Sequence, residues 1–196
     1  FQTSFPEAVE TEARALKAAA GKNAEKRLDC RGRPTFTIDP IDAKDFDDAL
    51  SVREVGDGKW EVGVHIADVS HYVRPGTALD EEAKKRATSI YLVDRTVPML
   101  PEILSNDLCS LNPDEDKLTF SVIFILNDRG EILNTHFAKT VIRSQKRFTY
   151  EEGQQTLDQG HGPFHSELAI LNRLAARLRE KKIAAGAITF ENDEIK

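Results

Sequence analysis

Alternating apolar and polar positions predict two β-hairpins in this chain. Residues 49–55 and 60–67 show the period of two that half-buried strands have, and Gly56-Asp57-Gly58 between them is typical of a tight turn. The second hairpin runs from Leu118 to Ile142 and turns at residues 127–130. On the 60–67 strand one face is apolar, formed by Trp60, Val62, Val64 and Ile66.

Helical patterns occur in four places. They are residues 7–20, residues 79–88 with Thr77 as the cap, a helix that begins with a capping box of Thr149 and Glu152, and residues 164–185 with Leu168, Leu171, Leu174 and Leu178 on one face. Residues 89–113 read as irregular chain because prolines interrupt them, and residues 187–190 read as the start of a further strand.

The order of these elements predicts an α+β fold. Hairpins precede helices, so a mixed, mostly antiparallel sheet flanked by helices fits better than a regular βαβ series. The polar, basic stretch 22–34 reads as a loop or linker. We therefore expect residues 1–34 to be a helical lead-in and linker, and residues 35–196 to be one larger domain.

Composition narrows the class of protein. Hydrophobic residues make up 40%, charged residues 31%, and the net charge is -6, which is typical of a globular chain rather than a disordered one. No apolar run approaches the ~18 residues of a membrane span. No secretory signal precedes the first helix, so we expect a cytoplasmic protein without a membrane partner. The sequence opens on Phe1 rather than Met, so we expect it to be part of a longer protein.

The two cysteines, Cys30 and Cys109, lie far apart and belong to no C-x-x-C pair. Thiolate zinc ligation is therefore not expected, and two reduced core thiols are the favoured interpretation. A disulfide between them stays open at this point.

The most informative segment carries five aspartates within ten residues, at positions 39, 42, 45, 47 and 48. Carboxylates that converge must be protonated, paired or bound to cations, and Asp oxygens favour hard ions such as Mg²⁺ or Mn²⁺. The alternative is an exposed acidic loop. Interleaved apolar residues (Ile38, Phe46, Ala49 and Leu50) favour a packed segment instead, and the spacing does not fit an EF-hand.

The string Thr37 to Leu50, with its Asp-Ala-Lys-Asp-Phe-Asp-Asp core, closely resembles the signature of the ribonuclease II/R catalytic domain, the RNB domain. Three further strings resemble the same family in the same order: Val64–Ser70, Val97–Pro101 and Leu104–Pro113. The similarity is greatest to bacterial ribonuclease R and covers the chain from about Phe5 to its last residue.

This resemblance implies an enzyme, a metal-dependent exoribonuclease that degrades single-stranded RNA from the 3′ end to nucleoside 5′-monophosphates. It implies that Asp39, Asp45, Asp47 and Asp48 form the catalytic set and hold Mg²⁺, with Mn²⁺ as a substitute. Asp47 matches the position most critical for catalysis, and Asp42 lies outside the set.

The resemblance also implies RNA-binding residues. Aromatic clamp positions fall on Tyr91, Tyr150 and Phe190, which could stack on unpaired bases. The basic residues Arg143, Lys146 and Arg147 flank Tyr150 and are candidates for phosphate contacts. Ordinary half-buried tyrosines and a solvated basic face are the alternatives, and the net acidic charge argues mildly against RNA binding. His65 is expected to be a packed, hydrogen-bonded histidine rather than a general base.

The family's catalytic domain continues beyond Lys196, and OB-fold RNA-binding domains flank it. An arginine expected to stabilise charge at the scissile phosphate lies in that C-terminal part, so whether this chain is active alone stays open. Two rivals remain: a non-catalytic family member that binds RNA or a protein, and an unrelated domain whose acidic loop binds a structural cation.

Overall fold

The computed structural model describes residues 3–20, 26–93 and 95–188, and its centre is a seven-stranded mixed sheet with the order β1-β8-β7-β4-β3-β2-β9. The strands are β1 (Leu28–Asp29), β2 (Thr35–Asp39), β3 (Asp48–Glu54), β4 (Lys59–Ala67), β7 (Asp116–Asn127), β8 (Ile132–Arg143) and β9 (Lys146–Thr149). Neighbouring strands are antiparallel except for two parallel pairs, β1 with β8 and β2 with β9. This confirms the expected α+β fold with a mostly antiparallel sheet.

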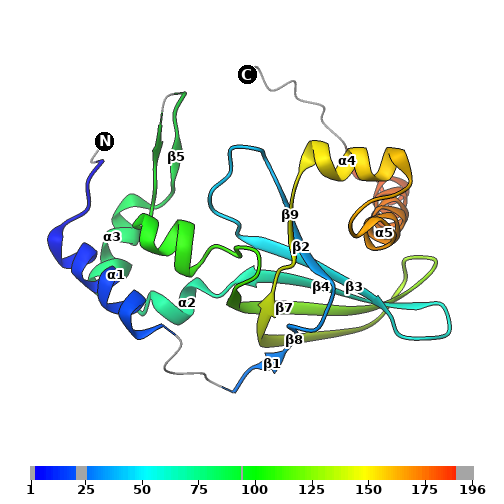
Figure 1. The fold of residues 1–196 in the computed structure, drawn as a ribbon, viewed down its shortest axis with the longest axis horizontal. Coiled ribbons are helices and arrows are strands. Elements are labelled where there is room, and N and C mark those ends of the chain that lie inside the picture. Colours follow the sequence, from blue (N-terminus) through cyan, green and yellow to red (C-terminus); the bar gives the residue numbers. More distant parts are fainter. Residues whose placement is uncertain (1–2, 21–25, 94, 189–196) are drawn as a thin grey trace.

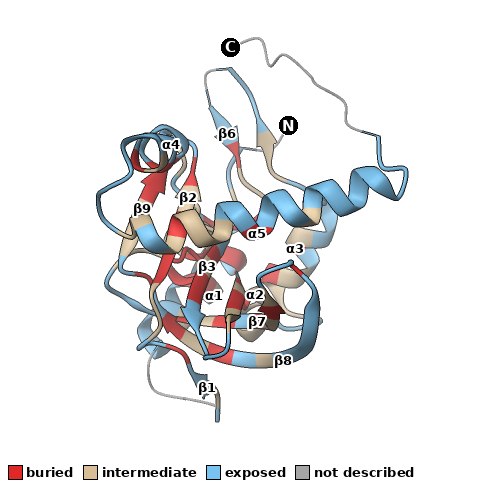
Figure 2. Ribbon diagram, turned by 90° about the vertical axis from the view of Figure 1, so that its right-hand side faces the viewer, coloured by how far each residue is buried: buried red, intermediate tan, exposed pale blue. Residues whose placement is uncertain are grey.

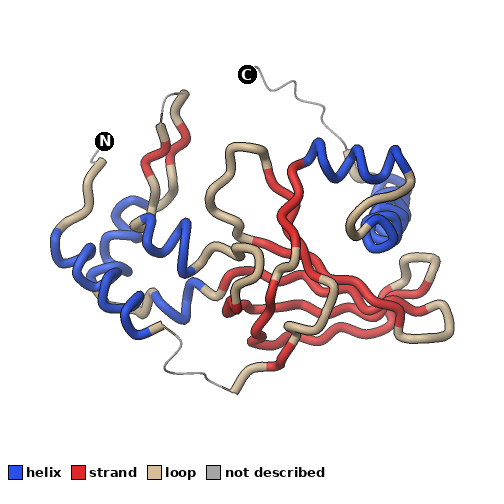
Figure 3. The backbone as a smooth tube through the Cα atoms, viewed as in Figure 1, coloured by secondary structure: helices blue, strands red, loops and turns tan. Residues whose placement is uncertain are grey.

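The helices gather in two groups at opposite ends of the sheet (Figures 1 and 3). The first group holds α1 (Glu7–Ala19), α2 (Val69–Tyr72), α3 (Ala78–Arg86) and a π-helix, η1 (Ile103–Leu108). The second holds α4 (Tyr150–Gln159) and α5 (His165–Ala184). A two-stranded ribbon, β5 (Ile90–Tyr91) and β6 (Thr96–Val97), stands out from the first group (Figure 1).

Hydrophobic clusters pack against both faces of the sheet. Ile123 belongs to the cluster that includes Leu79 of α3 and Leu104 of η1, whereas Val62 packs with Leu174 of α5. Ile123 pairs with Gly63, the neighbour of Val62, so the two clusters lie on opposite faces. Figure 2 shows α5 crossing in front of the buried strands with most of its surface exposed.

Most predicted elements are confirmed to within a residue or two. The hairpins are β3–β4 and β7–β8, and Thr77 caps α3 by accepting from the Asp80 amide. The capping box of Thr149 and Glu152 is present at α4. Both cysteines are free and buried, as the favoured interpretation had it.

Three segments differ from the sequence-based expectation. The stretch 22–34, expected to be a loop, contains β1, which pairs with β8. The stretch 89–113, expected to be irregular, contains the β5–β6 ribbon and η1. Ala187 and Ile188 are not in a strand, and the rest of that predicted strand, with Phe190, lies outside the described residues. None of the helices in the described ranges is long and apolar enough to cross a membrane.

Candidate active site

The acidic segment connects two neighbouring strands of the sheet. Asp39 is the last residue of β2, Asp48 is the first of β3, and the loop between them carries Asp45 and Asp47. Asp39 is buried, at 8% exposure, whereas Asp48 is exposed. The expected apolar anchors are packed: Ala49 is fully buried, and Phe46 lies against the main core cluster. The loop is therefore a structured part of the fold.

Backbone hydrogen bonds fix this loop to the other strings that carry the family resemblance. The Phe46 amide donates to Ser110 Oγ at 3.0 Å, and the Leu111 amide donates to the Phe46 carbonyl at 2.9 Å. The Ala67 amide donates to the Asp47 carbonyl at 2.9 Å. Three strings that are far apart in the sequence thus meet around the aspartates.

The four candidate carboxylates act on one another electrostatically. Burial raises the pKa of Asp39, and the charges of Asp48 and Asp45 add to that rise. Partial burial of the Asp47 carboxyl also raises its pKa, although the residue as a whole is exposed, and Asp45, Asp48 and Asp39 add to the effect. Asp42 is exposed and is absent from these interactions. Asp39, Asp45, Asp47 and Asp48 therefore share one region of space.

The chemistry of this donor set fits a hard divalent cation. Asp39 Oδ2 is buried and has no hydrogen-bond partner, which is costly for a carboxylate unless a cation faces it. All four side chains offer the oxygen ligands that Mg²⁺ and Mn²⁺ prefer. Within the described ranges, however, no group of three or more His, Cys, Asp or Glu side chains is already arranged to hold a metal ion. The side chains would have to turn towards one another to do so.

Tyr91 lies at this site, although it is 46 residues from Asp45 in the sequence. Its hydroxyl donates to Asp45 Oδ2 at 3.4 Å, a long hydrogen bond, and its side chain is 69% exposed on the β5–β6 ribbon. Burial of the hydroxyl, followed by the charge of Asp45, raises the pKa of Tyr91. An exposed ring beside a carboxylate cluster is free to stack on a ligand.

Tyr150 is the first residue of α4 and is 57% exposed. The residue before it, Thr149, pairs with Asp39 across the parallel β2–β9 ladder. Tyr150 thus follows the strand end that adjoins the acidic loop, which was not evident from the sequence. Phe190 lies outside the described residues.

The three candidate phosphate-binding residues have different surroundings. Arg143, the last residue of β8, donates from Nε to Asp116 Oδ1 of β7 at 2.8 Å. Lys146 Nζ lies 3.7 Å from the Glu152 carboxylate. Only Arg147 contacts the acidic loop, where it donates to the carbonyl of Pro40 at 2.5 Å and to that of Ile41 at 3.0 Å. No sequence pattern identified this contact, nor those of Ser110 and Tyr91 with the loop.

His65 is a buried structural histidine, as the sequence predicted. It is fully buried, with Nε2 hydrogen-bonded to Ser51 Oγ at 2.9 Å and Nδ1 to Ser121 Oγ at 2.7 Å. Burial lowers the pKa of His65 to about 4, so the ring is neutral at physiological pH. An enclosed, neutral, doubly bonded ring cannot exchange protons with a substrate.

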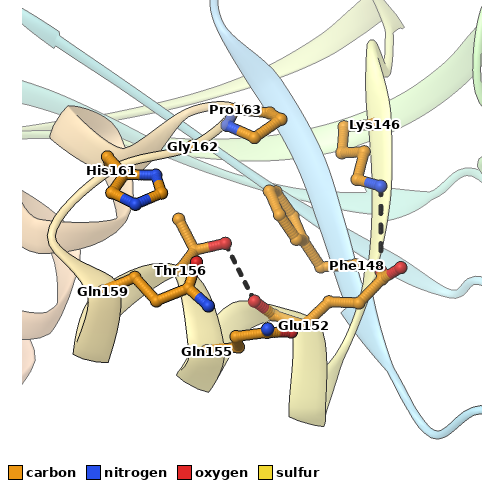
Figure 4. Close-up of a pocket in the computed structure, with 9 residues that line it drawn as sticks. All are labelled: Lys146, Phe148, Glu152, Gln155, Thr156, Gln159, His161, Gly162 and Pro163. Atoms are coloured by element: carbon orange, nitrogen blue, oxygen red, sulfur yellow. Dashed lines mark hydrogen bonds and ion pairs between the residues drawn. The ribbon is translucent and has the colours of Figure 1, made fainter.

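A cavity of about 350 Å³ lies elsewhere, between β9 and α4 (Figure 4). Its lining includes Lys146, Phe148 and His161, and none of the aspartates. The cavity is therefore separate from the candidate site.

The fold and the acidic loop together define the chain as an RNB domain. The RNB domain model matches residues 27–196, and the chain belongs to this family, which confirms the resemblance drawn from the sequence motifs. The chain is 44% identical to ribonuclease R of Thermotoga maritima over 199 residues, 98% of this chain and 28% of that protein. It is 44% identical to the human exosome complex exonuclease RRP44 over 177 residues, 89% of this chain and 18% of that protein.

Solved structures agree with this assignment. RNase R of Mycoplasma genitalium in complex with ribose-methylated single-stranded RNA superimposes with a TM-score of 0.84 at 30% identity. The match covers 97% of this chain and 31% of that one. This chain thus spans less than a third of the length of these relatives.

Proposed function

We propose that this chain is the acidic part of a processive 3′-to-5′ exoribonuclease site that hydrolyses single-stranded RNA to nucleoside 5′-monophosphates with Mg²⁺. The observation that carries the proposal is the set of four mutually interacting carboxylates, Asp39, Asp45, Asp47 and Asp48, with one buried and unpaired oxygen on Asp39. Its relatives named exonuclease or ribonuclease R, at 44% identity, support an RNA substrate.

In this proposal the four aspartates hold the metal ion, and Mn²⁺ can replace Mg²⁺. The bound ion would supply Lewis-acid chemistry, activating water and offsetting charge on the phosphodiester. Asp39 and Asp47, whose pKa values are raised without a cation, would become fully ionised ligands when one is present. Asp45 and Asp48 would complete the ligand set from the loop and from the start of β3.

Tyr91 and Tyr150 would hold the RNA strand by stacking on its bases. Each base–aromatic stack contributes ~1–3 kcal/mol with little sequence preference, which suits an enzyme that moves along any sequence. Their exposure, 69% and 57%, leaves both rings available. Phe190 would be a third stacking residue, and Arg143 and Lys146 would contact the RNA backbone at the rim.

We propose further that the longer protein supplies what the family resemblance implies beyond this chain. That includes the remaining part of the catalytic domain with its phosphate-stabilising arginine, and OB-fold domains that bind RNA. Coverage of 18% to 31% of the relatives supports this. We place the activity in the cytoplasm.

The test compares this chain with a version extended through the rest of the catalytic domain. Both are incubated with 5′-labelled single-stranded RNA and Mg²⁺, with Asp47→Asn and EDTA as controls. Stepwise shortening from the 3′ end that disappears in both controls is the expected result, and activity restricted to the longer version would show that the additional segment is required. No hydrolysis by either folded protein would overturn the proposal and favour a non-catalytic RNA- or protein-binding role.

A further inference from the structure

Arg147 differs from the other basic residues near the site because its guanidinium contacts the protein backbone of the acidic loop. Nη2 donates to the carbonyls of both Pro40 and Ile41, the two residues that follow Asp39. The guanidinium carbon also lies 5.5 Å from the centroid of the Phe46 ring, within cation–π range. A single side chain thus contacts both the beginning and the end of the loop.

The pairing of β2 with β9 fixes the position of the Arg147 backbone. β2 and β9 are parallel, with Thr37 opposite Arg147 and Asp39 opposite Thr149. Arg147 is therefore anchored to the strand that leads into the loop, beside the residue two positions before Asp39. Its Nε is buried, whereas the carbonyls that Nη2 reaches belong to exposed residues of the loop.

The contact of Arg147 with the Phe46 ring lies between two of the catalytic candidates. Phe46 separates Asp45 from Asp47, and its ring packs against the main core cluster. A guanidinium over this ring, bonded at the same time to Pro40 and Ile41, limits how far the two ends of the loop can move apart.

We infer that Arg147 is a positioning residue that holds the aspartate loop in shape for the metal, and that it is not primarily an RNA phosphate contact. The inference rests on the proposed function and makes it more specific. It also separates Arg147 from Arg143 and Lys146, whose charged groups pair with Asp116 and Glu152 and do not touch the loop.

The deciding variant is Arg147→Lys in the full-length protein. Lysine keeps the charge, so a residue that acts as a phosphate contact would be largely replaced by it. A lysine ammonium cannot reproduce the planar fork that bonds two carbonyls and lies over a ring. We expect kcat on single-stranded RNA and Mn²⁺ affinity without RNA, measured by calorimetry, each to fall about 10- to 100-fold, as for groups that orient metal ligands.

RNA affinity in EDTA supplies the contrasting measurement. We expect its Kd and its dependence on salt to be unchanged in Arg147→Lys and in Arg147→Met. Weaker RNA binding, with a salt slope smaller by about one unit in Arg147→Met and restored in Arg147→Lys, would identify a phosphate contact and overturn the inference.

Two further variants are a control, Arg173→Lys, and a test of the ring contact, Phe46→Leu. Arg173→Lys changes an arginine that also combines a hydrogen bond with a ring contact, since Arg173 donates to the Asp128 carboxylate at 3.0 Å and lies 5.7 Å from the Trp60 ring. It is on α5, and we expect no change in kcat or Mn²⁺ affinity. Phe46→Leu removes the ring under Arg147 and should lower kcat in the same direction as Arg147→Lys, by a smaller factor.

Amide hydrogen exchange over residues 41–48 tests the inference without metal or RNA. We expect faster exchange in both Arg147 variants and unchanged exchange in Arg173→Lys. If the unaltered protein hydrolyses no RNA while Arg147 variants still exchange faster, the proposed function fails but the positioning of the loop stands. Unchanged exchange together with an unchanged kcat would remove the positioning role.

Discussion

Two groups of polar side chains lie in neighbouring parts of the sheet, and they differ in how completely their hydrogen bonds are satisfied. His65 of β4 is bonded on both ring nitrogens, to Ser51 of β3 and Ser121 of β7. The chain of bonds continues from Ser121 to Thr140 and from Thr140 to Thr119. Each of these five side chains is at most 2% exposed.

The aspartate loop next to this network is not satisfied in the same way. Asp39 Oδ2 is buried without a partner, and the pKa values of Asp39 and Asp47 are raised. Ser110 and Arg147 bond to the loop backbone, and the one hydrogen bond described above to a carboxylate of the set, from the Tyr91 hydroxyl to Asp45, is long at 3.4 Å.

The difference separates a structural polar cluster from the candidate functional one. A fully paired buried network adds rigidity and specifies one arrangement of the strands. An unpaired set of like charges costs stability and persists where a ligand compensates it. Variants in each cluster test whether the His65 network mainly contributes to stability and the aspartates mainly to activity.

The largest expected effect is on catalysis in Asp47→Asn. Loss of a proposed metal ligand should lower kcat by at least ~100-fold, because groups that merely orient ligands already cost about 10- to 100-fold. Without metal the variant should be as stable as the parent or more so, because one of several repelling carboxylates is gone. RNA hydrolysis and thermal unfolding in EDTA measure the two effects. A marked loss of stability would place Asp47 with the structural cluster instead.

The next largest effect is on folding in His65→Ala. The change leaves the hydroxyls of Ser51 and Ser121 without their partner and opens a cavity, so the free energy of unfolding should fall by about 2–4 kcal/mol. Urea unfolding of the chain measures this. The affinity of the folded protein for Mn²⁺ should not change, and a change would mean that the two clusters are coupled.

Gly63→Ala tests the same network without removing any of its polar groups. A Cβ at Gly63 would lie 2.5 Å from both His65 Nε2 and Ser51 Oγ, so the ring and the hydroxyl would have to shift. We expect a smaller loss than in His65→Ala, of about 1–3 kcal/mol, as for other overpacked sites. Equal stability to the parent would show that the network has room to adjust.

The two clusters should respond to pH in opposite directions. The pKa of Asp39 is raised in the folded chain, so the folded state binds protons more readily, and this contribution to stability is lost as pH rises above the usual Asp range. The pKa of His65 is lowered to about 4, so its contribution is full above ~6.5 and is lost as pH falls towards 4.

Unfolding measured in EDTA between pH 4 and pH 7 separates the two contributions. Relative to the parent, Asp39→Asn should gain stability as pH rises, whereas the deficit of His65→Ala should shrink as pH falls. Added Mg²⁺ should reduce the first trend and leave the second alone. If both variants follow the parent at every pH, neither group titrates as its surroundings imply.

Local parts of this fold were predictable from the sequence, and long-range contacts were not. The two hairpins and the Thr149–Glu152 capping box depend on residues close together in the chain, so period and turn chemistry identify them. The parallel β2–β9 pair joins residues more than 100 positions apart, and no local pattern marks it. The contact of Arg147 with Pro40, across 107 residues, depends on that pairing.

The residues of the candidate site also differ in whether local sequence or long-range contacts identify them. The aspartates are neighbours in the sequence, so their spacing indicated a cation site, and the family resemblance singled out four of the five. Tyr91 was singled out only as a stacking ring, because the direction of its hydroxyl depends on how the β5–β6 ribbon stands against the loop. Ser110 lies in one of the strings that resemble the family, but its contact with the loop was not evident, since a serine that accepts one backbone amide looks like any other in the sequence.

The smallest expected effect concerns the Tyr91 hydroxyl. Tyr91→Phe keeps the ring for stacking and removes the hydrogen bond to Asp45, which is long at 3.4 Å and exposed, so its loss should cost little. We expect RNA affinity to stay unchanged and kcat to change by no more than about fivefold, the equivalent of ~1 kcal/mol. Tyr91→Ala should weaken RNA binding by ~1–3 kcal/mol in addition. Filter binding in EDTA and single-turnover hydrolysis distinguish the two variants. Equal losses of affinity in both would mean that the hydroxyl, and not the ring, contacts RNA, and the unsatisfied cluster would then extend from the aspartates onto the ribbon.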